Sequence, residues 1–218
     1  MQIQGAIFDM DGTLIDSLGS WDDFIEFFET DYHLKFDRVK NADLLRQFRT
    51  TPINEVAVIV HELFGIGDSA ETIANQLAER LEQFYRTRVE CKEDIPAFLA
   101  GLSKKGVKMC IASATRPELI RVVLRRLGIN DYFPEIVSCE VLGKNKSFPD
   151  VFLAALERLG TPKEQTWVFE DSFVALQTAK KAGFHTVGVF DRNNDRQDLV
   201  AEFSDEYIAE GESICRLL

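Results

Sequence analysis

The chain has 218 residues, of which 45% are hydrophobic and 28% charged, and its formal net charge is −11 at pH 7. This length can bury a full core, and the composition is ordinary for a globular protein, so disorder is not expected. The negative charge argues against nucleic acid or an anionic membrane as the main partner. We therefore expect an anionic substrate to need a local positive site, such as a divalent cation with a lysine.

The four cysteines are widely separated and form no CxxC pair. Cys110 and Cys139 lie in apolar, strand-like runs, which favours buried reduced thiols. The N-terminus enters a strand without a basic region and an apolar signal core, and no apolar run approaches membrane-spanning length. These features predict a soluble protein of a reducing cytoplasm.

The first predicted element is an apolar strand that ends in two acids and a glycine, in the run AIFDMDGTL. Because side chains alternate along a strand, Asp9 and Asp11 can project to the same side of its carboxyl end. Gly12 removes the Cβ where the backbone must turn sharply. Two carboxylates this close repel each other unless a cation lies between them or one is protonated. The pattern favours a metal-assisted reaction on an anion; the alternative is an Asp-rich turn without a function.

The next region, roughly residues 16–90, has a helical pattern. Aromatic and aliphatic side chains recur at helical spacing from Trp21 to Phe28, and Asp16 and Ser17 are candidates for the helix cap. Glycines at Gly65 and Gly67 separate two of the later segments. Further helices are predicted at about residues 38–48, 53–64 and 70–88.

After residue 90, strands alternate with helices. This alternation indicates βαβ units, a parallel sheet with helices on both faces, and ligands bound beyond the carboxyl ends of the strands. We predict a doubly wound parallel α/β domain from residues 1–15 and 91–218, with an all-helical domain inserted at residues 16–90. The helices are predicted at residues 95–105, 117–127, 149–159 and 174–182, and the strands at 107–112, 136–139, 166–169 and 186–190.

Polar residues that are candidates for a functional site follow two more of the predicted strands. Ser113 ends the strand at 107–112; it could cap the next helix, but Thr115 is closer to that helix and is the better cap. Ser113 is therefore left for another role. Glu170 and Asp171 end the strand at 166–169, and the helix dipole that follows explains one acid more readily than two. With Asp9 they offer the oxygen ligands that Mg²⁺ prefers.

Two lysines, Lys144 and Lys146, precede a helix that starts at Pro149-Asp150. An ammonium at this place would neutralise both Asp9 and an incoming anion, which would otherwise repel each other. A solvated loop lysine is the alternative for either residue.

These motifs resemble, in order, the four motifs of the haloacid dehalogenase (HAD) superfamily of phosphohydrolases. FDMDGT is similar to the first motif, hhhDxDGT, Ser113 to the second, and EDS at residues 170–172 to the fourth. The third motif, Lys-Pro-x-Pro-Asp, indicates Lys146 by its spacing from Pro149. Ser147 replaces the first proline, and Lys144 follows a glycine as the family lysine often does, so it remains a rival. Val174 and Ala175 depart slightly from the fourth motif.

The resemblance extends to the helical insertion, which looks like the C1 cap of β-phosphoglucomutase- and phosphoglycolate phosphatase-like members. It implies that Asp9 attacks phosphorus to form an aspartyl-phosphate, while Asp11 acts first as general acid and then as general base. The implied metal is Mg²⁺, bound by Asp9, the Asp11 backbone carbonyl and Asp171, with Glu170 as a ligand or a water holder. The implied phosphate contacts are the Ser113 hydroxyl, nearby backbone N–H groups such as that of Ala114, and Lys146.

The insertion is expected to determine the substrate. Arg49 lies in a helix–loop–helix turn similar to one that contacts substrate in relatives, although it could equally be a surface arginine. Asp11 argues against a carbon–halogen dehalogenase, which lacks this second acid. Trp21, expected in the core of the insertion, falls near the place where β-phosphoglucomutases have a histidine. The three histidines, His33, His61 and His185, do not occupy that place.

Three functions remain in view. The leading hypothesis is a Mg²⁺-dependent phosphatase of a small phosphorylated metabolite such as a sugar phosphate. A β-phosphoglucomutase-like phosphotransferase would use the same motifs, and the missing histidine favours hydrolysis over it. A catalytically silent binding module is disfavoured because a binder needs neither a nucleophile nor an acid. We expect a monomer or a weak homodimer.

Overall fold

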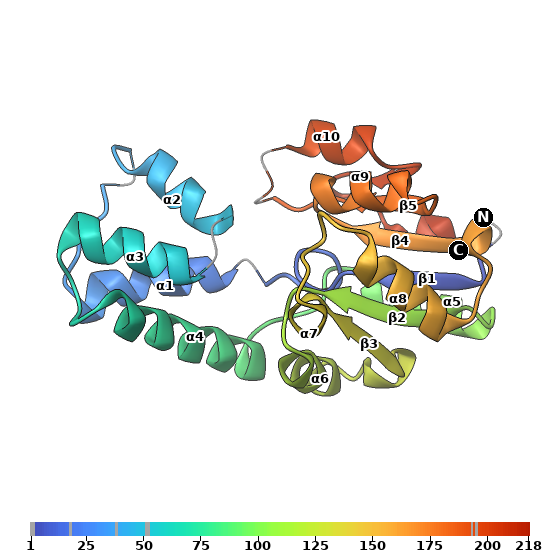
Figure 1. The fold of residues 1–218 in the computed structure, drawn as a ribbon, viewed down its shortest axis with the longest axis horizontal. Coiled ribbons are helices and arrows are strands. Elements are labelled where there is room, and N and C mark those ends of the chain that lie inside the picture. The colour runs from blue at the N-terminus through green and yellow to red at the C-terminus, as the bar shows by residue number, and fades with distance from the viewer. Residues whose placement is uncertain (1–2, 18, 38, 51–52, 193, 195) are drawn as a thin grey trace. The chain divides into compact units, whose positions relative to one another are not determined.

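The computed structural model describes residues 3–17, 19–37, 39–50, 53–192, 194 and 196–218. The side chains of residues 46, 47, 49 and 50 lie outside this description. The chain divides into two compact units, one formed by Met1–Asp16 with Glu90–Leu218 and the other by Ser17–Val89. Each unit is described separately below, with the element labels of Figure 1.

The first unit is built on a six-stranded sheet with the order β3-β2-β1-β4-β5-β6. All five strand pairs are parallel. β1 lies inside the sheet and is buried along its whole length, as its uninterrupted apolar sequence requires. The prediction of a doubly wound parallel α/β sheet is confirmed. The strands are β1 (Gly5–Phe8), β2 (Lys108–Ser113), β3 (Glu135–Ser138), β4 (Thr166–Glu170), β5 (His185–Val189) and β6 (Glu206–Ile208).

Helices cover both faces of this sheet. The helices are α5 (Ile95–Lys104), α6 (Pro117–Arg126), α7 (Cys139–Leu142), α8 (Asp150–Leu159), α9 (Phe173–Lys181) and α10 (Gln197–Glu202), with 3₁₀ turns at Asn130–Tyr132, Lys163–Gln165 and Ile214–Leu217. On one face, Phe152 of α8 and Ala179 of α9 join one buried cluster with Ile7 of β1; α8 crosses in front of the sheet in Figure 1. On the other face, Phe8 stacks on Phe169 at 4.4 Å between ring centroids, and Phe98 of α5 packs against both rings. Ile7 and Phe8 therefore fix β1 between two apolar layers.

The second unit contains the helices α1 (Gly19–Asp31), α2 (Ala42–Thr50), α3 (Ile53–Phe64) and α4 (Ala70–Thr87). Its core is a cluster to which Trp21 and Phe28 of α1, Val60 of α3 and Leu77 of α4 contribute. Trp21 is 8% exposed, as expected of a core residue. No helix among the described residues of either unit is long and apolar enough to cross a lipid bilayer.

Several boundaries differ from those predicted. α2 begins at Ala42 and not near residue 38, because the Asp37 carboxylate accepts the N–H groups of Val39 and Lys40 and holds that segment in a turn. The third strand ends at Ser138, so placing Cys139 in a strand was wrong; the Ser138 hydroxyl caps α7 there. Cys139 is nevertheless buried and free, as is Cys110. α7, α10 and β6 are additions that the sequence pattern did not predict.

Candidate active site

The residues singled out in the sequence meet at the carboxyl edge of the central strands. Phe8, the last residue of β1, lies beside Ile111 of β2 and Phe169 of β4. Asp9 follows directly, and its N–H donates to the carbonyl of Phe169 at 2.9 Å. Ser113 and Glu170 are the last residues of β2 and β4. The parallel register therefore delivers these side chains to one place.

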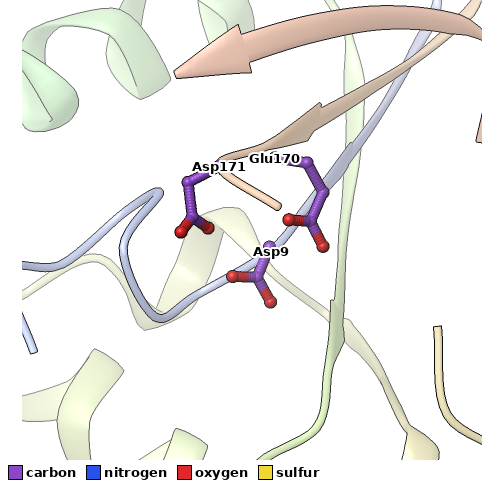
Figure 2. Close-up of side chains that lie close together, drawn as sticks. All are labelled: Asp9, Glu170 and Asp171. Atoms are coloured by element: carbon purple, nitrogen blue, oxygen red, sulfur yellow. The ribbon is translucent and has the colours of Figure 1, made fainter. Parts of the chain in front are cut away.

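Three carboxylates form the centre of this edge. Asp9, Glu170 and Asp171 each offer an oxygen within 4.8 Å of the others, and Figure 2 shows the three groups turned toward a common space. Asp9 is 7% exposed and Glu170 is 1% exposed. The Asp11 carboxylate is not a member of this described group, so any contribution of Asp11 to a metal would come from its backbone, as the motif implies.

The electrostatics of the cluster indicate a missing positive charge. Burial, together with the charges of Glu170 and Asp191, raises the pKa of Asp171 to about 8. Burial also raises the pKa of Asp9 well above its usual range, and Lys146 offsets this only in part. Carboxylates that are costly to ionise alone become favourable ligands once a divalent cation lies between them. The donor set is all oxygen, which fits Mg²⁺.

Lys146 provides the positive charge that the chain itself brings to the cluster. Its ammonium lies between two carboxylates and donates to Asp9 Oδ1 and to Glu170 Oε1. Burial alone would lower the pKa of Lys146, but the two carboxylates outweigh that effect and raise it. Lys144 instead pairs with Asp150 at 2.5 Å, with half of its side chain exposed. The structure thus brings Lys146, and not Lys144, to Asp9.

Asp171 is held by its surroundings. The Thr13 hydroxyl donates to Asp171 Oδ1 at 3.2 Å, and the Asn194 amide donates to the Asp171 carbonyl at 2.6 Å. Gly12 has φ +82°, and a Cβ there would lie 2.6 Å from Asp171 Oδ2. Both the backbone angle and the close approach therefore require glycine at this turn.

Asp11 and Ser113 are linked through Thr115. The Thr115 hydroxyl donates to Asp11 Oδ2 at 2.8 Å, and the Thr115 N–H donates to Ser113 Oγ at 3.1 Å. The prediction that Thr115 caps the next helix was wrong, because Arg116 occupies the cap position of α6 without a side-chain hydrogen bond. Ser113 is 1% exposed, whereas Ala114 is exposed at the end of the strand. Thr115 is a site residue that the sequence reasoning missed, although its place two residues beyond Ser113 offered a signal.

A second missed feature is the ion pair between Lys92 and Asp191. Lys92 Nζ lies 2.8 Å from Asp191 Oδ2 and donates to the Phe190 carbonyl at 2.7 Å. Asp191 is 2% exposed and contributes to the raised pKa of Asp171. An aspartate just after the predicted strand at residues 186–190 could have been noticed, but no local pattern marks Lys92.

Arg49, the predicted substrate contact, belongs to α2 in the second unit. Its side chain lies outside the described residues, so its role stays a prediction.

Comparisons with known proteins identify the family of this chain. A family model described as haloacid dehalogenase-like hydrolase matches residues 6–189. The chain is 28% identical to a phosphorylated carbohydrates phosphatase of Thermotoga maritima, over 91% of this chain and 90% of that protein. It is also 28% identical to a β-phosphoglucomutase of Bacillus subtilis, over 86% of this chain and 83% of that protein.

The fold has solved counterparts as well. A crystal structure from Thermotoga maritima, provisionally named as a β-phosphoglucomutase, superposes with a TM-score of 0.85. Its sequence is 26% identical, and the match covers 99% of this chain and 98% of that one. The chain belongs to the haloacid dehalogenase-like hydrolases, and its predicted resemblance to that family is confirmed.

Proposed function

We propose that this protein is a Mg²⁺-dependent phosphatase that hydrolyses a small phosphorylated metabolite through an aspartyl-phosphate on Asp9. One observation carries the proposal: the carboxylate of Asp9 is buried beside Glu170 and Asp171 and is bound by the Lys146 ammonium. A structural ion pair does not need three acids around one lysine, whereas a site for a metal and a phosphoryl group does. Membership of a hydrolase family supports the same reaction.

The proposed reaction has two displacements. An Asp9 carboxylate oxygen bonds to phosphorus as the ester P–O bond breaks, and Asp11 gives its proton to the leaving oxygen. Asp11, now a carboxylate, then takes a proton from water as that water attacks the aspartyl-phosphate. The products are inorganic phosphate and free Asp9, and Asp11 regains the proton it gave away. Each residue therefore ends in its starting state.

Charge on the phosphoryl oxygens needs compensation during both displacements. The carboxylates of Asp9, Glu170 and Asp171 would hold Mg²⁺ together with the Asp11 carbonyl, and the bound ion would neutralise and align these oxygens. Lys146 would contribute its ammonium from the side of Asp9 and Glu170. The Ser113 hydroxyl and the Ala114 N–H, at the end of β2, would orient a third oxygen.

The residues of the first unit support the reaction, but they do not identify the substrate class. We propose a sugar phosphate, because the Thermotoga maritima relative is named a phosphatase of phosphorylated carbohydrates. The helical unit, inserted after the Asp9–Asp11 turn, would supply selectivity, with Arg49 as a contact to the substrate. Replacing Arg49 by Ala should then raise KM for the preferred substrate more than it lowers kcat. An unchanged KM would remove Arg49 from the substrate site.

The rival function is a phosphotransferase, since a β-phosphoglucomutase is also among the relatives. Such an enzyme must keep water from the phosphoenzyme so that a sugar hydroxyl attacks instead. Trp21, near the place where mutases have a histidine by the motif resemblance, is buried in the core of the helical unit. A buried indole there offers no acid or base, and this favours hydrolysis.

The proposal is tested by phosphate release from hexose, pentose and glycolate phosphates, nucleotides and β-glucose 1-phosphate, each with Mg²⁺ and with EDTA. Release that requires Mg²⁺ is the expected result. Conversion of β-glucose 1-phosphate into glucose 6-phosphate without release would support the mutase. Activity that persists in EDTA would contradict the metal site.

The composition of the chain bears on its partners and its location in the cell. The net charge of −11 favours small-molecule partners over nucleic acid or anionic membranes. We propose a cytoplasmic enzyme that is a monomer or a weak homodimer.

A further inference from the structure

Thr115 lies outside the four motifs and touches the proposed acid–base residue. Its hydroxyl donates to Asp11 Oδ2 at 2.8 Å. Asp11 is partly exposed, so rotation of its carboxylate would turn an oxygen toward water. A short hydrogen bond from a side chain more than a hundred residues away restricts that rotation.

The backbone of Thr115 is itself fixed from two sides. Its N–H donates to the hydroxyl of Ser113, the last residue of β2, at 3.1 Å. Its carbonyl accepts from the hydroxyl of Ser138, the last residue of β3, at 3.1 Å. Ser113 and Ser138 are almost fully buried, and they are register partners in the sheet. These two hydrogen bonds therefore fix the backbone from which the Thr115 side chain extends.

We propose that Thr115 is a positioning residue that holds Asp11 Oδ2, so that Asp11 Oδ1 is the oxygen that moves the proton. This rests on the proposed function. When Asp11 is a carboxylate, Oδ2 accepts the hydroxyl proton; when Asp11 is protonated on Oδ1, Oδ2 still accepts it. The same hydrogen bond thus persists in both half-reactions, and only the orientation of Oδ1 toward the reacting oxygen depends on it. Orientation of this kind contributes to general acid–base catalysis.

The test replaces Thr115 by Val, which keeps the shape of the side chain and removes the hydroxyl. We expect kcat to fall by about 10- to 100-fold, because general acid–base assistance is worth about 10²–10⁴-fold in total. KM should change by less than about threefold, since substrate contacts are untouched. Rapid-quench samples should show slower formation and slower hydrolysis of the phosphoenzyme, because Asp11 acts in both half-reactions. Thr115→Ser restores the hydroxyl and should restore most of the rate.

The matched control is Thr178→Val in α9, which removes a hydroxyl that donates only to its own helix, at the Val174 carbonyl. It should leave the rate and the phosphoenzyme level unchanged. Wild-type turnover in Thr115→Val, or a loss that Thr115→Ser does not repair, would overturn the positioning role. Thr115→Ala serves if the valine variant does not fold.

A crystal structure of Thr115→Val tests the geometry separately from activity. We expect the Asp11 carboxylate to leave its wild-type position, and an unmoved carboxylate would overturn the inference even in an inactive protein. Absence of phosphatase activity in the wild type would contradict the proposed function instead. The two failures are therefore distinguishable.

Discussion

At the level of single residues, the site has more carboxylates than ammonium groups that contact them. Asp9 and Glu170 are buried carboxylates and Asp171 is a half-buried one, and the Lys146 ammonium pairs directly with Asp9 and Glu170. Lys92, the next cation, is bound to Asp191 and so compensates a fourth acid first. When all three carboxylates are ionised, the negative charge that Lys146 does not balance is what a divalent cation would neutralise, and this makes Lys146 more important than an ordinary ion-pair partner.

Replacement of each motif lysine by Met separates their roles. Lys146→Met removes the ammonium from Asp9 and Glu170, and we expect kcat to fall by about 10²–10³-fold, the usual effect of losing one charge-stabilising donor. Lys144→Met removes only a half-exposed surface pair with Asp150 and should change kcat by less than about twofold. Steady-state kinetics with saturating Mg²⁺ measure both. Equal effects of the two substitutions would contradict the assignment of Lys146.

The site residues that directly follow a strand could be predicted from the sequence. Those whose role depends on loop geometry or on a tertiary contact could not. Asp9, Ser113, Glu170 and Asp171 each stand at the end of an apolar run, so strand pairing alone brings them together. The choice between Lys144 and Lys146 depended on loop geometry, which spacing alone left open. Thr115 looked like a helix cap because a hydroxyl before a helix has that local use, and its bond to Asp11 is a tertiary contact.

The turn after β1 is the element on which the metal site depends most. Gly12 has a positive φ and lies against the Asp171 carboxylate. Gly128, after α6, has φ +70° with nothing within 4 Å of an added Cβ, so it has the backbone angle without the contact. Comparing substitutions at the two glycines therefore separates the effect of backbone strain from the effect of a Cβ against the Asp171 carboxylate.

We predict that Gly12→Ala weakens Mg²⁺ binding as well as stability, because Asp171 must move to make room. Gly128→Ala should cost about 1 kcal/mol of unfolding free energy from backbone strain alone, with unchanged Mg²⁺ affinity. Isothermal titration with Mg²⁺ and urea unfolding measure the two effects. Wild-type Mg²⁺ affinity in Gly12→Ala would contradict the placement of Asp171 as a ligand.

The secondary-structure elements were predictable where the apolar pattern is long. α3 has the bounds expected from its helical period, Ile53–Phe64, and the strands of the sheet interior are continuous apolar runs. β6 has three residues and pairs only with β5, so its alternation is too short to recognise. Before α10, the Arg196 N–H donates to the side-chain oxygen of Asn194. No apolar periodicity marks the start of this helix in the sequence.

At the scale of the whole molecule, the carboxylates of the site couple stability to pH. The pKa of Asp171 is raised to about 8 in the native protein, against about 4 in the unfolded chain. Between these values the native state binds more protons than the unfolded state, so stability falls as pH rises. The shift of Asp9 acts in the same direction. Mg²⁺ binds the deprotonated carboxylates and should oppose this loss increasingly at higher pH.

We therefore predict that Mg²⁺ raises the unfolding free energy more at pH 8 than at pH 5, and that the metal-free protein is less stable at pH 8 than Asp171→Asn. Urea unfolding at both pH values, with Mg²⁺ or with EDTA, measures these differences. The Asp171→Asn variant removes the titration of this carboxylate together with its effect on the pKa of Asp9, and both changes act in the same direction. A Mg²⁺ effect that is independent of pH would contradict the proposed ligands.

Under both the proposed phosphatase and its rival, a phosphotransferase, the first step would be the transfer of a phosphoryl group to Asp9. The most direct measurement is therefore rapid quenching of wild-type enzyme during turnover with Mg²⁺, followed by mass spectrometry of the peptide that contains Asp9. We predict one added phosphoryl group on Asp9, absent from Asp9→Asn, which should retain the fold and lose turnover. Phosphate release by Asp9→Asn, or turnover without a phosphorylated Asp9 at any quench time, would contradict the account.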